Sequence, residues 1–224
     1  MCGHPLGDKP APEPTPESAA VQSLSSGRRH ATVMFTDVSG YTALSERLDP
    51  EDVHRLINEV KEAATRIVEK HGGIVNQFVG DEVLALFGIP NATEDDPVRA
   101  IKAALELHAH IRENIDDLLA RTGDRLQIHT GINTGLMIAE YSADREGLYR
   151  LTGDTVNTAA RLRSLAEADQ ILIGPNTQRL VKFYFQMVPC PPVRVKGKAA
   201  PIVPYQVLAE SRISSRFEAA RERG

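Results

Sequence analysis

Two aspartates fall where one particular topology would bring them together. Asp37 follows the apolar run Thr32–Phe35, and Asp81 lies in the turn between two further apolar runs. In a β-α-β-β unit the end of the first strand lies beside the hairpin that joins the next two. Two carboxylates there can share two divalent cations about 3.5–4 Å apart, and Mg²⁺ prefers such oxygen ligands. A lone Asp in a turn is more often an Asx-turn or a helix cap, so it is the pairing that indicates a metal site.

The residues after Asp37 suit the approach of a phosphate. They read Val38-Ser39-Gly40-Tyr41-Thr42, and no P-loop Lys-Ser/Thr motif is present. Small residues at this point let backbone N–H groups turn toward an anion, and a helix N-terminus adds a favourable dipole. An ordinary strand-to-helix turn would look the same, so the segment predicts phosphate binding only together with the aspartates.

A third constellation lies in a predicted helix over residues 154–166. Asn157 and Arg161 are four positions apart, so they project from one helical face, and small apolar residues lie between them. A solvated helix face could have the same composition. Arginine, however, is the side chain that best holds a phosphoryl oxygen through a forked contact.

The elements that must position these residues alternate along the chain. Asp49 and Pro50 open a helix as N-cap and first helical residue, and apolar residues then follow helical spacing. The order predicts a β-α-β-β-α-β, ferredoxin-like core of the α+β class with a C-terminal extension. Strands are expected at 32–35, 74–79, 83–87, 126–132, 171–173 and 203–208, and helices at 50–70, 95–119 and 154–166.

Composition divides the chain into three parts. Residues 1–28 are rich in proline and are expected to be a disordered leader, residues 29–210 form one domain, and residues 211–224 read as a charged helical linker or tail. Such a tail predicts further domains in a longer protein.

Charge and apolar patterning exclude several classes of function. The net charge of −4 does not indicate nucleic-acid binding, and no apolar run has the length of a membrane span. The only cysteines are Cys2 and Cys190, which argues against a structural disulfide and favours a cytoplasmic protein.

Four motifs, in order, resemble class III adenylyl/guanylyl cyclase catalytic domains of bacterial type. The resemblance covers about His30 to Leu208, nearly all of the predicted ordered chain. The stretch Glu94-Asp95-Asp96 with Arg99-Ala100 is similar to bacterial members fused to other domains. The four motifs are Phe35-Thr36-Asp37, Gly80-Asp81 with the following Ala85-Leu86-Phe87-Gly88, Gly153–Leu162, and Val195-Lys196-Gly197-Lys198.

The resemblance implies a role for each candidate residue. Asp37 and Asp81, helped by the Val38 carbonyl, would bind two Mg²⁺ or Mn²⁺ ions. Asn157 would orient the ribose, and Arg161 would stabilise charge on the α-phosphate. Ser39, Gly40, Tyr41, Thr42 and Lys196 (or, failing it, Lys198) would contact the substrate. Family active sites form between two protomers, so a homodimer is implied.

The sequence departs from the family where the purine is chosen. Active adenylyl cyclases usually carry Lys four residues before the second metal Asp, where this chain has Gln77. They carry Asp or Thr seven residues before the Asn, where this chain has Arg150. The Gln77 amide can donate or accept, but Arg150 offers donors only. Reading of adenine would be weakened, which keeps GTP open as a substrate beside ATP.

The function expected from the sequence is conversion of ATP to cyclic AMP and pyrophosphate. The main alternative is an ATP-binding, cyclase-like regulatory module with little or no turnover. Polymerase palms and diguanylate cyclases share the β-α-β-β-α-β unit. The neutral-to-acidic charge does not suit a polymerase, and the glycine-rich active-site motif of diguanylate cyclases is missing.

Overall fold

A mixed β-sheet forms the centre of the computed structural model, which describes residues 27–114, 126–142, 148–194 and 200–211. The strands run in the order β2-β3-β1-β4-β6-β8-β7, and β5 pairs with β4 off this path. The strands are β1 (Gly27–Ser39), β2 (Ile74–Val79), β3 (Glu82–Phe87), β4 (Gln127–Tyr141), β5 (Tyr149–Thr152), β6 (Ile171–Ile173), β7 (Phe185–Pro189) and β8 (Tyr205–Glu210). The helices are α2 (Tyr41–Arg47), α3 (Pro50–Lys70), α4 (Asp96–Asn114), α6 (Asp154–Leu165) and α7 (Pro175–Val181).

The first strand is the axis of the sheet. β1 pairs antiparallel with β4 along its whole length and with β3 on its other side. The order β1-α3-β2-β3-α4-β4, with β2-β3-β1-β4 as neighbours, is the ferredoxin-like unit. The predicted α+β, ferredoxin-like core is therefore confirmed.

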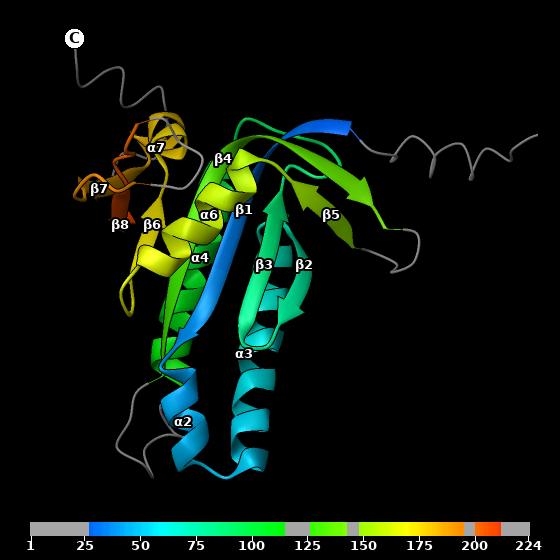
Figure 1. The fold of residues 1–224 in the computed structure, drawn as a ribbon, viewed down its shortest axis with the longest axis vertical. Helices are drawn as coiled ribbons and strands as arrows, with labels where there is room; N and C mark the ends of the chain where they lie inside the picture. The colour runs from blue at the N-terminus through cyan, green and yellow to red at the C-terminus, as the bar shows by residue number, and fades with distance from the viewer. Residues whose placement is uncertain (1–26, 115–125, 143–147, 195–199, 212–224) are drawn as a thin grey trace, which may run out of the picture.

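Helices cover both faces of this sheet (Figure 1). α3 and α4 pack against each other on one face, and α6 lies over β4 and β1 on the other. Alternation along β1 feeds both cores: Met34 and Val38 face α3 and α4, whereas Val33 and Phe35 face α6. Each such buried side chain contributes about 1.5–3 kcal/mol.

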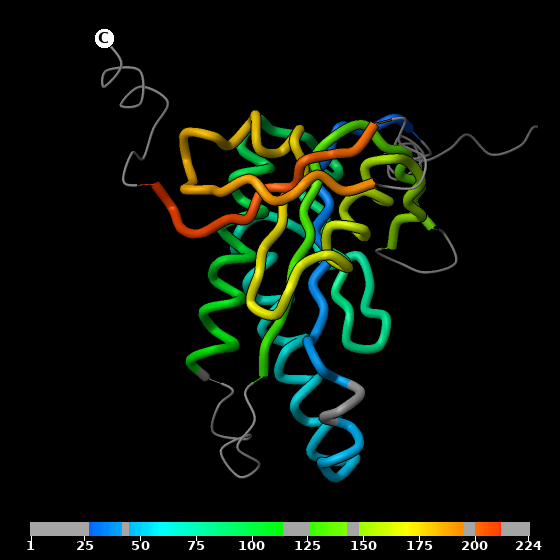
Figure 2. Tube along the Cα trace, turned by 60° about the vertical axis from the view of Figure 1, so that its left-hand side comes forward, coloured from blue at the N-terminus to red at the C-terminus, as the bar shows by residue number. Residues whose placement is uncertain are grey.

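One end of the molecule carries the features that position the candidate site. α2 and the beginning of α3 extend beyond the sheet, below the end of β1 and the β2–β3 turn in Figure 1. The turned view in Figure 2 has the same arrangement. The last residues of β1, which include Asp37, and the β2–β3 turn, which contains Asp81, therefore lie at the same end of the sheet.

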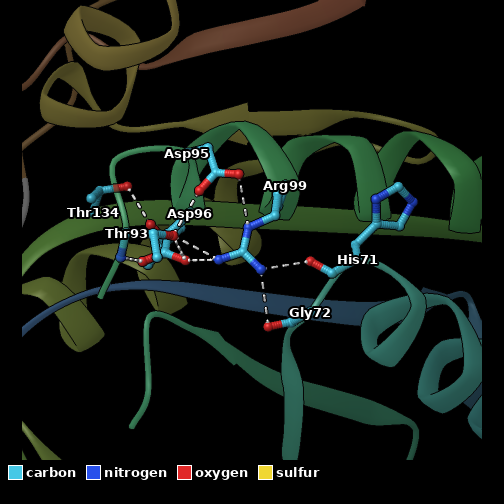
Figure 3. Close-up of polar contacts among 8 residues, drawn as sticks. His71, Gly72, Thr93, Asp95, Asp96, Arg99 and Thr134 are labelled. Atoms are coloured by element: carbon cyan, nitrogen blue, oxygen red, sulfur yellow. Dashed lines mark hydrogen bonds and ion pairs between the residues drawn. The ribbon is translucent and has the colours of Figure 1, made fainter. Parts of the chain in front are cut away.

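The acidic motif before α4 has a structural use (Figure 3). The Arg99 guanidinium donates to the carbonyl oxygens of His71 and Gly72, at 3.2 and 3.3 Å, and pairs with the Asp96 carboxylate. Asp96 in turn accepts from the backbone N–H of Thr93 at 2.7 Å. This cluster joins the end of α3 to the beginning of α4, and we call it the Arg99 cluster.

Several elements differ from the expectation. β1 and β4 are longer than predicted, while α2, β5, α7 and β7 were not predicted. Asp49 is the N-cap residue of α3, but its backbone carbonyl, and not its side chain, accepts the hydrogen bonds of Asp52 and Val53. Gly27 and Arg28, at the end of the predicted leader, belong to β1. None of the described helices has the length and apolar character needed to cross a membrane.

Candidate active site

Asp37 lies where β1 leaves the apolar core. Its partner in the β1–β4 ladder is His129, whose Nε2 is 3.8 Å from Asp37 Oδ2. The same carboxylate oxygen accepts a hydrogen bond from Arg163 Nη1 at 2.9 Å. The Asp37 side chain is only 19% exposed, so this charge is partly desolvated and its neighbours matter.

Asp81 meets Asp37 from the β2–β3 turn. Gly80 has a φ of +63°, which an L side chain rarely adopts, and this backbone turns the chain tightly enough to present Asp81. Burial raises the pKa of the Asp81 carboxyl, and so do the Asp37 charge and a side-chain hydrogen bond with Asp37. The N–H groups of Asp81 itself and of Val38 act in the opposite direction.

The pair of carboxyl groups fits a divalent cation. Two carboxyls close enough to share a proton repel each other when both are ionised, and a cation between them removes that repulsion. Among the described residues, no group of three or more His, Cys, Asp and Glu side chains is arranged as a metal site. Mg²⁺ commonly uses one or two carboxylates together with substrate phosphates and water, so the Asp37–Asp81 pair suffices in donor type.

Glu82 and Arg163 complete a cluster that the sequence did not reveal. Arg163 Nη2 is ion-paired with Glu82, so one guanidinium bridges Glu82 and Asp37. Burial raises the pKa of Glu82, Arg163 opposes that shift, and the charges of Asp37 and Asp81 reinforce it. We call Asp37, Asp81, Glu82, His129 and Arg163 the carboxylate cluster.

His129 connects this cluster to the predicted phosphate segment. Its Nδ1 is hydrogen-bonded to Ser39 Oγ at 2.8 Å. Burial lowers the pKa of His129, and the positive charge of Arg163 lowers it further. A neutral imidazole here holds Ser39 without adding a cation beside Asp37.

A series of buried side-chain hydrogen bonds holds Thr36, the residue before Asp37. Thr36 Oγ1 and Thr130 Oγ1 are 2.9 Å apart, and His108 Nε2 is 2.9 Å from Thr130 Oγ1. Burial lowers the pKa of His108 to about 4, so it is neutral near pH 7. The series links α4 through β4 to the residue that precedes Asp37, which restrains the end of β1.

Helix α6 reaches the cluster because a glycine lets it approach β4. A Cβ at Gly131 would lie 2.1 Å from the Arg163 backbone nitrogen and 2.4 Å from the Ala159 carbonyl oxygen. Arg163 turns inward to Asp37, while Asn157 and Arg161 are exposed. Residues two apart on a helix point in nearly opposite directions, so α6 presents one arginine to its own cluster and another outward.

The candidate base-reading residues lie on two elements joined by one amide. Asn76 Nδ2 donates to the Tyr149 carbonyl oxygen at 3.0 Å, and the Tyr149 N–H donates to Asn76 Oδ1 at 2.7 Å. Asn76 is 1% exposed and lies at an irregularity in the β2–β3 pairing. Gln77 and Arg150, the residues that follow, are both exposed.

The other predicted substrate contacts are placed only in part. Gly40 has a φ of +74° and is exposed, Tyr41 begins α2, and the backbone of Thr42 continues that helix. The predicted contact Lys196, together with Lys198, lies outside the described residues. Whether these residues bind a nucleotide stays a prediction.

Sequence reasoning missed Glu82, Arg163, His129 and Asn76. Glu82 directly follows Asp81, and Arg163 lies two residues after Arg161 on the opposite helical face, so both could have been suspected from spacing. His129 becomes a neighbour of Asp37 only through the register of β1 with β4. Asn76 carried no signal, because a lone Asn in a strand has no characteristic pattern.

The geometry agrees with a known enzyme family. The model of the adenylate and guanylate cyclase catalytic domain matches residues 25–209. The chain belongs to this family. The class III cyclase resemblance found in the four motifs is thus confirmed over nearly all of the described residues.

Solved cyclase domains superpose on the chain. The adenylyl cyclase CyaB from P. aeruginosa is 33% identical, with a TM-score of 0.78 over 84% of this chain and 98% of that one. The guanylate cyclase domain of RhGC from Catenaria anguillulae, in complex with GTP, is 29% identical, with a TM-score of 0.74 over 83% of this chain and 100% of that one.

Curated relatives include cyclases for both purines. The guanylate cyclase soluble subunit beta-2 of Rattus norvegicus is 29% identical over 191 residues, covering 82% of this chain and 27% of the relative. Adenylate cyclase 1 of Rhizobium meliloti is 27% identical over 206 residues, covering 91% of this chain and 31% of the relative. The chain thus spans about a quarter to a third of the length of these relatives.

Proposed function

We propose that this cyclase domain converts ATP to cyclic AMP and pyrophosphate with two divalent metal ions, at composite sites of a homodimer. The observation that carries the proposal is the meeting of the Asp37 and Asp81 carboxyl groups at one end of the sheet. Family membership supplies the reaction class, and the exposed face of α6 supports the dimer.

Asp37 and Asp81, with the Val38 carbonyl, would hold Mg²⁺ or Mn²⁺. When bound, the ions lower the pKa of the ribose 3′-hydroxyl and neutralise the triphosphate. Both carboxyls would have to be ionised for that purpose, and burial and the Asp37 charge oppose this at Asp81 by raising its pKa. Two backbone N–H groups already favour the ionised form of Asp81, which reduces the cost of removing its proton.

The segment Ser39–Thr42 would bind the triphosphate with its backbone amides. Gly40 opens the turn at the beginning of α2, and Ser39 is fixed by His129. The positive end of a helix dipole favours an anion at this point. Lys196 would add a contact to the β- and γ-phosphates.

Asn157 and Arg161 would act on the nucleotide bound by the partner protomer. Both are exposed on the α6 face that points away from their own carboxylate cluster. An arginine that stabilises transition-state charge in phosphoryl transfer contributes about 10³–10⁵ in rate. In a symmetric dimer each α6 would complete the other subunit's site.

A second function is an ATP-binding regulatory module with little turnover. Gln77 and Arg150 favour it, because the residues usual in adenylyl cyclases are replaced at both base-reading positions. GTP remains the competing substrate, since Arg150 offers donors that suit the guanine carbonyl.

The direct test is to incubate the purified protein with ATP or GTP and Mn²⁺ or Mg²⁺, and to measure cyclic nucleotide. We expect cyclic AMP from ATP, and loss of that activity in Asp37→Asn. The control is Asp52→Asn on the exposed side of α3, which is expected to keep activity. Metal-dependent nucleotide binding without any cyclic product would favour the regulatory module instead.

The composite site has its own test. Asp37→Asn and Arg161→Ala proteins, each inactive, are mixed after partial denaturation to exchange subunits. A heterodimer would rebuild one intact site, so random exchange restores roughly a quarter of wild-type activity. If heterodimers form, as verified with two affinity tags, and activity stays absent, the two sets of residues act within one chain.

A further inference from the structure

We propose that Arg163 is a built-in counter-cation that competes with the divalent ion for Asp37 and so sets the metal affinity of the site. The inference rests on the proposed binding of the ion by Asp37 and Asp81. It adds a residue that acts through Asp37, in the same subunit, before substrate arrives.

The geometry places the Arg163 guanidinium on the Asp37 carboxylate, which is one of the two groups that would hold the ion. Nη1 donates to Asp37 Oδ2 at 2.9 Å, and Nη2 is paired with Glu82. The three side chains are only 17–24% exposed. Their mutual attraction is therefore less screened by water than that of a surface pair.

The charges explain why a resident cation is needed. Asp37, Asp81 and Glu82 converge on a small volume: the Asp37 charge raises the pKa of both other carboxyls, and the Asp81 charge raises that of Glu82. An arginine is always protonated, so Arg163 offsets this repulsion at any pH in the absence of metal. A divalent ion would offset it more strongly, and both cations would then compete for the Asp37 carboxylate.

Glu82 can keep Arg163 paired when Asp37 binds the ion. Its Nε has no hydrogen-bond partner within the described part of the chain, so the guanidinium is anchored through its two terminal nitrogens. Glu82 is not one of the two predicted metal ligands, and it can retain Arg163 after Asp37 turns to the ion. The pair Arg163–Glu82 thus permits exchange without leaving a buried arginine unpaired.

Competition between Arg163 and the ion has opposite effects on the stability of the metal-free protein and on its metal affinity. Arg163 stabilises the metal-free protein and weakens the metal complex, and thermodynamic linkage makes these two effects reciprocal. A residue that merely holds Asp37 in place would instead support both the metal-free fold and metal binding. The sign of the change in metal affinity therefore separates the two roles.

The experiment measures Mn²⁺ binding to the full chain without nucleotide, by calorimetry and by loss of the free-Mn²⁺ EPR signal. Arg163→Gln is expected to bind Mn²⁺ about tenfold more tightly, since it removes a charge-assisted hydrogen bond to the ligand. Its metal-free melting temperature should fall, and Mn²⁺ should raise it more than in the wild type. Arg179→Gln, the same change at an exposed arginine of α7, is the matched control.

Arg163→Lys keeps the charge but not the fork, so an intermediate affinity is expected. It also serves if Arg163→Gln does not fold, because unchanged or weaker Mn²⁺ binding in the variant that folds overturns the inference. Asp37→Asn distinguishes the two proposals: if it removes Mn²⁺ binding while Arg163→Gln changes nothing, only the role of Arg163 fails. If neither the wild type nor any variant binds Mn²⁺ without nucleotide, Arg163 has no ion to compete with and the inference fails, whereas the two-metal mechanism can still rest on ions that arrive with the triphosphate.

Discussion

Arg99 and Arg163 are both partly buried arginines that pair with two acidic side chains, yet their surroundings differ. In the Arg99 cluster the guanidinium also donates to backbone carbonyls, and Asp96 accepts from Thr93. A hydrogen bond from Thr93 lowers the pKa of the neighbouring Asp95. There, the surroundings of Asp95 favour its ionised form.

The carboxylate cluster has the opposite electrostatics. Burial and the neighbouring negative charges raise the pKa values of Asp81 and Glu82, with one arginine for three acids. Folding alone gains nothing from such an arrangement, and perturbed carboxyls of this kind are typical of functional sites. The comparison separates an acidic cluster that holds helices together from one that is kept ready for a ligand.

The largest expected effect is the contrast in activity and in the free energy of unfolding between Asp81→Asn and Asp96→Asn. Loss of one metal ligand should lower activity by about 10³-fold, since metal charge stabilisation is worth several kcal/mol. The same change should stabilise the metal-free protein above the raised pKa of Asp81, where ionisation opposes folding. Asp96→Asn should lower the free energy of unfolding by about 2–3 kcal/mol, because it breaks a buried pair.

Activity per folded molecule and urea denaturation at pH 7.5 measure both effects. In Asp96→Asn, activity per folded molecule should stay at the wild-type level. The comparison breaks if Asp81→Asn is destabilised and active, or if Asp96→Asn is stable and inactive.

A smaller effect is expected at the base-reading positions. Arg150→Thr combined with Gln77→Lys should sharpen the preference for ATP over GTP by roughly one to two orders of magnitude, because a hydrogen bond contributes about 1 kcal/mol or more. Thr is preferable to Asp here, since Glu140 lies opposite Arg150 in the β4–β5 ladder and two acids would repel. Asn76→Ala should blur the preference of the double variant.

The ratio of kcat/KM for ATP to that for GTP, in the parent and in the variants, is the measurement. A parent that already discriminates strongly, with no gain in the double variant, would mean that the purine is read elsewhere.

The smallest effect concerns His108, a buried histidine that is hydrogen-bonded to Thr130 and lies outside the carboxylate cluster. Its folded pKa of about 4 lies below the usual 6.5, so the unfolded chain binds the proton first as pH falls. The free energy of unfolding should decrease by about 2 kcal/mol between pH 7.5 and 5, through this group alone. Asp169, Arg112 and the titratable His129 are the groups that act on it electrostatically.

Urea denaturation of the wild type and His108→Gln at both pH values tests this. Gln can still hydrogen-bond Thr130, and the variant should lose about 2 kcal/mol less on acidification. His110→Gln, on the same helix but partly exposed, is the control. Identical pH dependence in the wild type and His108→Gln would contradict the assignment.

The sequence predicted what depends on local pattern. Asp37 and Asp81 could be paired because each follows a strand, and the β-α-β-β order fixes which ends meet. Arg163 could not be paired with Asp37, because that contact depends on how closely α6 lies on β4, which Gly131 decides. β1 and β4 were predicted too short, because threonines and glycines interrupt their apolar pattern. Those threonines pair across the two strands, Thr32 with Thr134 and Thr36 with Thr130.

The two-pronged amide of Asn76 has a consequence for how such a domain can change. It fixes the backbones that carry Gln77 and Arg150 without using either side chain. The residue that positions the backbone of the proposed base pocket, Asn76, is thus distinct from the two residues whose side chains would contact the base. Replacements at the two exposed positions can alter nucleotide choice at little cost to folding. Evolution can therefore change the purine preference of such a domain by substitutions at these two positions. A replacement of Asn76 would instead displace the backbones that carry both positions, and so would impair recognition of either purine.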